Sequence, residues 1–402
     1  MSLRFGPGVL VAAAFIGPGT VTACTLAGSN FGFALVWAPV FATLATIALQ
    51  DMAARLGAGA QLGLGEALMQ STPLPALKWA AAGLVFLALF IGNCAYEGGN
   101  LAGGALGLDA VLSTASPGQR VLVGILALIA GMAVLVGRYA LLEKMLIALV
   151  IVMSTAFLLS ALIVRPDVGA FVSGLRPQIP DGATMTAIAL IGTTIVPYNL
   201  FLHAAASRRK WPGGHGTAQA RADSAVSIGL GGLISILILS TAASSLFTSG
   251  LEVRNAADMA KAIEPAFGDA ARYLVGIGLF AAGLTSAITA PMATAYAVSE
   301  ILGTDDSRTS SLFRATALLV VVIGAAISLS GIRPVSLILI AQYANGLLLP
   351  IMAMFLLYVM NRKDLLGGHS NTLAANLLGG GIVLITLGLG LRSILRAAGL
   401  VP

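Results

Sequence analysis

Two long apolar segments of this 402-residue chain are each interrupted by a proline among small polar residues. The first interruption, residues 17–20, reads Gly-Pro-Gly-Thr, and the second, residues 192–199, reads Gly-Thr-Thr-Ile-Val-Pro-Tyr-Asn. A helix broken in this way exposes N–H groups at the start of its second half and carbonyl groups at the end of its first half. The N–H ends favour anions and the carbonyl ends favour cations, so the two breaks together could bind an ion or a small polar solute.

The side chains at the breaks are neutral. Neither break contains a carboxylate or a thioether, the groups that would bind a hard or a soft divalent metal most tightly. Gln342 and Asn345, two amide side chains in the segment 335–360, are three residues apart. They therefore share one helical face, which could line the same site. The candidate substrate-binding residues are Gly17, Gly19, Thr20, Thr193, Thr194, Tyr198, Asn199, Gln342 and Asn345.

Two ionisable side chains lie within or near these apolar segments. An acid as deep as Glu97 is costly and usually functional, which favours a proton or ion relay over a structural carboxylate at a helix crossing. His203 follows the second break by five residues and could pass protons near neutral pH, or could simply lie at the membrane interface. The hydroxyls of Thr285 and Ser286 offer a sodium site as the alternative route of coupling, although capping within their own helix is the commoner role.

The composition indicates the elements that must position these residues. Hydrophobic residues make up 58% of the chain and charged residues 9%, with a mean hydropathy of +0.95. A soluble domain has about 25% charged residues, so both a soluble globular protein and a disordered chain are excluded. At ~20 residues per span the length fits about eleven membrane helices. We place them at 8–28, 34–54, 79–106, 120–136, 140–164, 183–205, 224–247, 271–298, 315–332, 335–360 and 372–398.

The charge pattern predicts the orientation. The net charge is +6, and no cluster of Lys and Arg exceeds the triplet at 208–210, which argues against a nucleic-acid partner. With the N-terminus inside, thirteen of the 22 Lys and Arg residues fall on the inner side. We therefore predict an integral protein of the bacterial inner (plasma) membrane, with a cytoplasmic N-terminus and an external C-terminus.

The two breaks occupy the same place in the first and the sixth span. Five spans separate them, and because five is odd, the second set of five is inverted relative to the first. Broken helices at matching positions in two halves are typical of secondary transporters built from inverted repeats. We expect the first repeat at 1–165, the second at 183–362, and an additional span at 372–398.

At these motifs the chain resembles the natural resistance-associated macrophage protein family of transporters. The resemblance covers nearly the whole sequence and rests on three segments, 17–20, 196–203 and 345–364. It implies an all-α polytopic membrane protein with the LeuT-type fold, two inverted five-helix repeats plus an eleventh helix. In metal-transporting members the first motif reads Asp-Pro-Gly-Asn and the second contains Met-Pro-His. This chain replaces the acid, the amide, the thioether and the first histidine of those motifs by Gly17, Thr20, Val196 and Tyr198.

These observations predict a secondary active transporter that moves a small solute by alternating access, coupled to protons or, as the other option, to sodium. Because two helix N-termini remain without the family's carboxylate, the substrate favoured is a small anion or zwitterion, such as bicarbonate or a small carboxylate. The alternative is a divalent metal cation, Mg²⁺ or Mn²⁺. A channel would need a filter loop or charged ring. An enzyme would need a nucleophile–base or metal constellation. Neither pattern is evident, and no cofactor or resident metal is expected.

Overall fold

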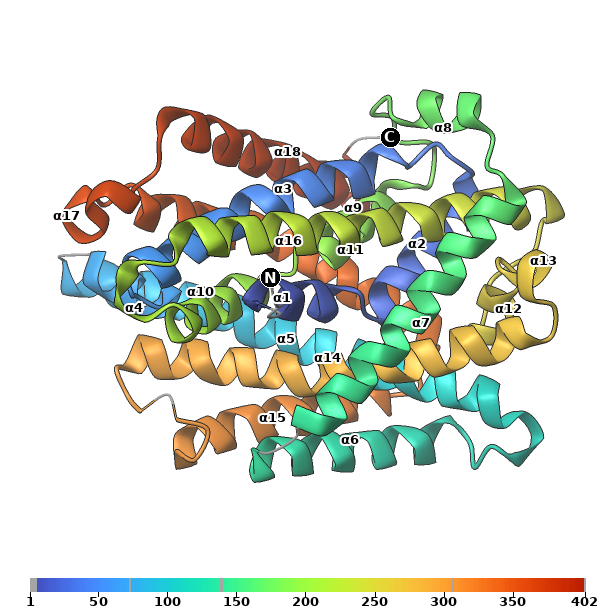
Figure 1. Ribbon diagram of the computed structural model, residues 1–402, viewed down its shortest axis with the longest axis horizontal. Coiled ribbons are helices and arrows are strands. Elements are labelled where there is room, and N and C mark those ends of the chain that lie inside the picture. The colour runs from blue at the N-terminus through green and yellow to red at the C-terminus, as the bar shows by residue number, and fades with distance from the viewer. Residues whose placement is uncertain (1–5, 72–73, 138–139, 306, 401–402) are drawn as a thin grey trace.

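The computed structural model describes residues 6–71, 74–137, 140–305 and 307–400, and these fold into helices joined by loops (Figure 1). Within this part of the chain there is no strand, and eleven long helices or broken helix pairs follow the eleven predicted spans in order. They are α1 with α2 (Pro7–Phe15, Pro18–Phe31), α3 (Trp37–Ala54), α5 (Pro75–Leu112), α6 (Gln119–Val136), α7 (Ala140–Val164), α9 with α10 (Thr184–Thr194, Tyr198–Lys210), α11 (Thr217–Ser245), α14 (Ala270–Leu302), α15 (Ser311–Ser328), α16 (Pro334–Met360) and α18 (Leu373–Ala397).

The polar connections are more helical than the sequence suggests. Short helices form within them, namely α4 (Leu64–Ser71), α8 (Val168–Gly174), α12 (Ala256–Ala260), α13 (Glu264–Phe267) and α17 (Lys363–Leu366). Between the predicted spans at 183–205 and 224–247, the connection is confined to residues 211–216, since α10 and α11 extend beyond those spans. Apolar residues mark only the part of a helix that lies in hydrocarbon, whereas the hydrogen bonds of the helix continue into the polar region beyond it.

Nine helical segments of the described chain are long and apolar enough to cross a bilayer, or ten when the pair α1 and α2 counts as one span. The helix α3 is not among them, although its 18 residues coincide with the second predicted span. Large apolar side chains of the peripheral helices are exposed, such as Leu128 at 67%, Leu377 at 67% and Leu384 at 72%. Such a surface suits lipid rather than water, so the chain is an integral membrane protein.

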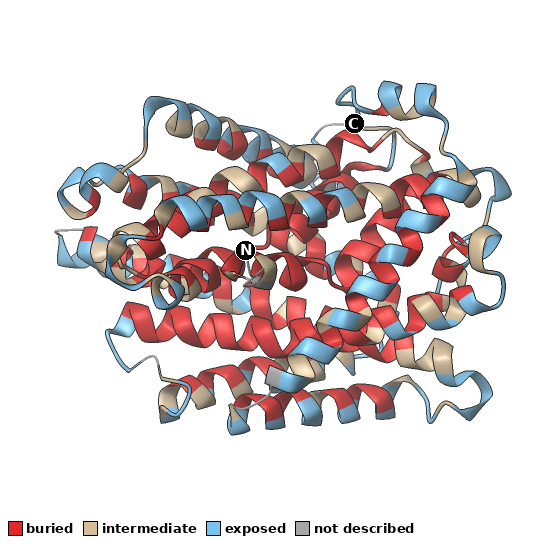
Figure 2. Ribbon diagram, viewed as in Figure 1, coloured by how far each residue is buried: buried red, intermediate tan, exposed pale blue. Residues whose placement is uncertain are grey.

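The broken helices lie in the interior of the bundle (Figure 2). Buried residues dominate α1, α2, α10 and α14, whereas exposed residues gather on α6, α8 and α18 at the periphery. Every residue from 11 to 29 in α1 and α2 is buried, and the pair α9 and α10 and the helix α14 are also largely buried. Side chains at both breaks are therefore shielded from lipid by the surrounding helices.

The two breaks share one backbone geometry. Ile16, which ends α1, has φ −76° and ψ 63°, and Ile195, which ends α9, has φ −95° and ψ 74°. A proline follows each of them by two residues and begins the next half at or beside its first position. The angle between α1 and α2 is 51°. This likeness fits the prediction of two equivalent halves, whose boundaries stay a prediction.

One end of the bundle carries the basic residues assigned to the cytoplasm. The helices α4 and α17 and the end of α10 gather there, while α8, α12 and α13 lie at the opposite end (Figure 1). Arg208 pairs with Glu66 at 2.8 Å, and Arg362 pairs with Asp364 at 2.8 Å. Hydrogen bonding to the Arg362 guanidinium lowers the pKa of Asp364 below its ordinary value. Arg4 and Arg138, which contribute to the predicted orientation, lie outside the described residues.

Candidate functional site

The carbonyl end of α1 is covered by hydroxyl groups from three other helices. The Tyr96 hydroxyl of α5 donates to the Ala14 carbonyl at 3.2 Å, and the Ser286 hydroxyl of α14 contacts the same oxygen at 3.4 Å. The Thr20 hydroxyl of α2 donates to the Phe15 carbonyl. The acceptors that a helix end leaves without partners are thus satisfied inside the protein.

Thr20 also joins the two broken helices. Its Oγ1 lies 2.9 Å from Oγ1 of Thr193 in α9, and both residues are at most 1% exposed. Because the Thr20 hydrogen points to the Phe15 carbonyl, Thr193 must donate its own hydrogen to Thr20. The structure therefore brings together two of the predicted substrate-binding residues, one from each break.

Replacement of Thr20 by valine keeps the side-chain shape but removes this link. The Phe15 carbonyl and the Thr193 hydroxyl would both lose their partner in a buried place, so the free energy of unfolding should fall by about 1–3 kcal/mol. A thermal-shift measurement on the purified protein in detergent should report it. Thr22→Val is the matched control, since Thr22 is equally buried on the same helix and its hydroxyl hydrogen-bonds, among the described residues, only to the Met259 sulfur at 3.9 Å. An equal loss of stability in both variants would contradict this assignment.

Both glycines of the first break lie against other helices. A Cβ atom added at Gly19 would overlap the amide of Gln342 in α16, so only glycine permits this approach. A Cβ atom added at Gly17 would lie 3.2 Å from Oγ of Ser286 and 3.5 Å from the hydroxyl oxygen of Tyr96. The predicted residues Gly19 and Gln342 are therefore neighbours, and Gly17 faces two hydroxyl groups.

The second break contributes Tyr198 and Asn199, the first two residues of α10. Both are 0% exposed, and the ring of Tyr198 packs on the ring of Tyr96 with centroids 5.5 Å apart. Within the part of the chain that the structure describes, neither amide atom of Asn199 has a hydrogen-bond partner, and the Oε1 atom of Gln342 has none either. These buried amides retain hydrogen-bonding capacity that a substrate could use.

Two other candidates take no part in the contacts between the breaks that the structure describes. The Thr194 hydroxyl donates to the Leu190 carbonyl at 3.4 Å within its own helix, so it caps α9 and does not point to the other break. Asn345 is buried on the face of α16 near Gly92 of α5, one turn away from Gln342. The central side chains are 0–1% exposed, so in this structure they pack against one another and the centre is closed.

Glu97 lies on α5 and is 0% exposed. Its aliphatic stem packs on α15, where a Cβ atom added at Gly324 would overlap it. Neither carboxyl oxygen makes a hydrogen bond of normal geometry, and Asn100, one helical turn further on, is the amide that can donate to it. No ion pair of Glu97 is found among the residues that the structure describes. An ionisable side chain at such a depth in a membrane protein is costly and is usually functional.

His203 is fully buried within the bundle. Its Nδ1 lies 2.8 Å from Oε1 of Gln50 in α3, and its Nε2 lies 3.1 Å from the hydroxyl of Ser224 in α11. The Ser224 hydroxyl also lies 2.7 Å from the Ala220 carbonyl. A neutral ring can accept the Ser224 hydrogen at Nε2, and a protonated ring can donate there while Ser224 turns to Ala220. The neutral ring and the protonated ring can thus each form hydrogen bonds at both nitrogen atoms, without any movement of the heavy atoms.

The donor set is unusual for a metal site. Among the described residues no three His, Cys, Asp or Glu side chains are close enough to hold a metal ion together. The centre offers hydroxyl and amide groups only, which suit a hard cation that keeps its water molecules or a small anion.

Three contributing residues escape sequence reasoning. Tyr96 stands next to Glu97 and carries a polar group, but nothing in its position indicates contact with the Ala14 carbonyl. Gln50 and Ser224, the partners of His203, come from segments 153 and 21 residues away. A polar residue in an apolar run is the only signal that Gln50 gives.

Comparisons with known proteins agree with the fold and the motifs. The family model described as natural resistance-associated macrophage protein-like matches residues 8–396. The divalent metal cation transporter MntH of Yersinia pestis (strain Pestoides F) is 25% identical over 396 residues, which cover 96% of this chain and 92% of that protein. A manganese transporter of Eremococcus coleocola superposes with a TM-score of 0.80 at 22% identity, over 97% of this chain and 85% of that chain. The nucleobase-cation-symport-1 family transporter Mhp1, in a closed conformation, gives a TM-score of 0.61 at 17% identity, over 98% and 93%.

Proposed function

This chain belongs to the natural resistance-associated macrophage protein-like family, a family of membrane transporters, and we propose that it is a secondary transporter of a hydrated divalent cation. Substrate would pass between the two sides by alternating access around the paired breaks. The contacts between Thr20 and Thr193 and between Gly19 and Gln342 close the centre, so both would have to open to admit it.

The names of the relatives support a cation more than the small anion predicted from the sequence. Divalent metal cation transporters match nearly the whole length of this chain, and no comparison supports an anion. We therefore prefer the alternative substrate, a divalent metal cation, to the small anion.

A hard cation of the Mg²⁺ type fits the centre better than a transition metal. The observation that carries this choice is the set of buried neutral oxygens at the breaks, with the amide oxygens of Asn199 and Gln342 unpartnered. Mg²⁺ loses water reluctantly, and its bound water molecules can donate to neutral oxygens. Mn²⁺ and Fe²⁺ gain more from carboxylate, thioether or imidazole ligands, and Gly17 and Val196 supply none of these.

The small anion remains the second candidate because of the helix ends. Neither α2 nor α10 has a side-chain cap at its N-terminus, so no side chain offsets the partial positive charge of either helix end. The Asn199 Nδ2 atom adds an unpartnered donor beside them. A charge introduced at position 17 would distinguish the two candidates, because a carboxylate there attracts a cation and repels an anion.

We propose Glu97 and His203 as the proton-coupling residues. The isolation of the Glu97 carboxyl group and the two hydrogen-bonded states open to His203 support this assignment. Sodium coupling has weaker support, because the Thr285 hydroxyl donates to the Ala281 carbonyl of its own helix and only Ser286 reaches α1. The proposed location is the bacterial inner membrane, with the basic end of the bundle in the cytoplasm.

The function is tested by uptake into proteoliposomes that contain the purified protein. We expect saturable uptake of Mg²⁺, faster with an inward proton gradient, and little competition from micromolar Mn²⁺. Labelled bicarbonate and empty liposomes are the comparisons. Saturable bicarbonate uptake without Mg²⁺ uptake would contradict the cation proposal and favour the small anion. Tight Mn²⁺ binding measured by calorimetry would contradict the preference for a hard cation.

A further inference from the structure

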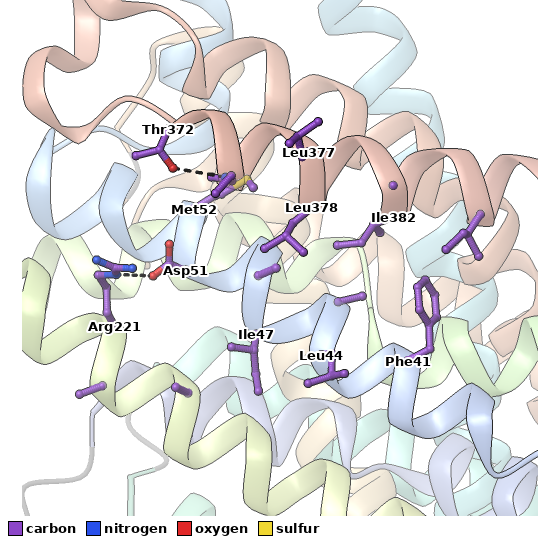
Figure 3. A pocket seen from close by; sticks show the side chains of 18 of the residues that line it. Phe41, Leu44, Ile47, Asp51, Met52, Arg221, Thr372, Leu377, Leu378 and Ile382 are labelled. Atoms are coloured by element: carbon purple, nitrogen blue, oxygen red, sulfur yellow. Dashed lines mark hydrogen bonds and ion pairs between the residues drawn. The ribbon is translucent and has the colours of Figure 1, made fainter. Parts of the chain in front are cut away.

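A groove runs along the membrane-facing surface between α3 and α18, and α11 closes one end of it (Figure 3). Its volume is about 1020 Å³. Apolar side chains line most of its length, among them Leu44 of α3 and Leu377 of α18, which are 63% and 67% exposed. The groove therefore opens to the surroundings of the bundle, and it is separate from the closed centre.

The groove is about as long as one leaflet of a bilayer is thick. Its lining on α3 extends from Phe41 to Asp51, a rise of ~15 Å at 1.5 Å per residue. The hydrocarbon core of a bilayer is ~30 Å thick. One acyl chain from one leaflet would thus fit along the groove.

At its charged end the groove is lined by Asp51 and Arg221, and the buried Arg55 lies beside Asp51 without lining the groove. The Asp51 carboxylate lies between two guanidinium groups, with Oδ1 2.5 Å from Nε of Arg221 and Oδ2 3.0 Å from Nε of Arg55. The other N–H groups of Arg55 donate to the 369 and 370 carbonyls and to the Asn371 side chain. One carboxylate and two guanidinium groups leave one positive charge, and Arg221 is the more accessible of the two cations.

Arg221 is free to bind a further anion. Its side chain is 58% exposed, and the only bond found for it among the described residues goes through Nε to Asp51. Figure 3 places Arg221 and Asp51 at one end of the groove and Phe41 at the other. Thr372, the N-cap of the 25-residue helix α18, lines the same end, so the partial positive charge of that helix terminus adds to the guanidinium.

We propose that this groove binds an anionic glycerophospholipid, with its phosphate at Arg221 and an acyl chain along α3 and α18. Phosphate oxygens match the free N–H groups of a guanidinium. A basic pocket between membrane helices at the cytoplasmic end is a known way to select anionic headgroups. A zwitterionic lipid would fill the apolar part of the groove equally well, but it has no net negative charge to neutralise the positive charge at the groove's end.

The proposal is tested by native mass spectrometry of the protein in detergent. The probes are phosphatidylglycerol and phosphatidylcholine with identical acyl chains. We expect wild-type protein to retain phosphatidylglycerol in preference. Arg221→Gln should weaken that retention about fivefold, since one basic residue near anionic lipid contributes about 1 kcal/mol. Arg314→Gln is the control, because Arg314 lies in α15, on the side of the bundle away from α3 and α18 (Figure 1).

Two adjacent glycines test the apolar part without disturbing the charges. Gly381 lines the groove and Gly380 does not, and a Cβ atom added at either position meets no atom within 4 Å. Gly381→Phe should therefore fill the groove and reduce retention of both lipids, whereas Gly380→Phe should bind them as the wild type does. Equal retention of the two lipids by the wild type, or unchanged binding by Gly381→Phe, would overturn the proposal.

Discussion

A transporter with Glu97 replaced by glutamine should take up its substrate at a rate that no longer depends on a proton gradient. The carboxyl group is 0% exposed and has no ion-pair partner among the described residues, so it holds a proton until a conformational change alters its surroundings. Glutamine has the shape of the protonated acid but cannot release a proton. Folding and substrate binding should be preserved, and the acceleration by an inward gradient should disappear.

The measurement is the ratio of initial uptake rates with and without the gradient, in proteoliposomes of equal protein content. Asp109→Asn is the matched control, because it removes an acid from the same helix, at its end, where Asp109 bonds with Ser116 at 2.5 Å. We expect this control to keep the wild-type ratio. If Glu97→Gln keeps it as well, the carboxyl group is a structural feature of the contact with α15 and not a proton carrier.

The architecture could be predicted because it depends on local signals. Pro18 and Pro197 each stand beside a helix break, as their small and polar neighbours predict. Proline alone is not sufficient, because α14 and α16 remain continuous across Pro291 and Pro350. Counting the apolar spans along the sequence places the breaks in the first and the sixth span. In the structure Ile16 and Ile195, which end the first halves of these spans, have similar ψ values. Span ends were predicted less well, since helices such as α10 continue past their apolar residues to Lys210.

The contacts within the site could not be predicted in the same way. Thr20 and Thr193 are 173 residues apart, and only the packing of α2 on α9 decides that their hydroxyls meet. The same threonine type at 194 points back into its own helix, because the side chain of the next residue turns by about 100° around the axis. Tyr96 gave no signal for its contact with Ala14, since a tyrosine in an apolar helix is most often a packing residue.

The sign of the substrate's charge could not be predicted from the sequence for a related reason. The sequence indicates the N–H ends of the two broken helices, which favour an anion. It does not indicate which groups cover their carbonyl ends. In the structure three hydroxyl groups cover the end of α1 and leave amide oxygens nearby without partners. A site with both kinds of group can favour either sign of charge, so the charge at its centre must be tested directly.

Gly17→Asp and Gly17→Asn provide that test, because the two side chains have similar volume and differ in charge. A side chain at position 17 starts 3.2 Å from Oγ of Ser286 and 3.5 Å from the Tyr96 hydroxyl, and both hydroxyls could donate to it after small shifts. An aspartate there would place a full negative charge in a poorly solvated centre, where charge interactions are much stronger than in water. For a hard divalent cation a carboxylate is also the preferred ligand.

If the substrate is a divalent cation, Gly17→Asp should bind Mg²⁺ at least about tenfold more tightly than Gly17→Asn, a difference of ~1.4 kcal/mol in binding free energy. Calorimetry on the two purified variants measures this directly and does not require that either of them still transports. A small anion should behave in the opposite way, with binding lost in the aspartate variant and retained in the asparagine variant. Equal binding of Mg²⁺ by both variants would mean that the volume of the side chain at position 17, and not its charge, determines binding at the centre. This result would contradict the cation proposal, because a carboxylate beside a bound divalent ion must change the affinity for it.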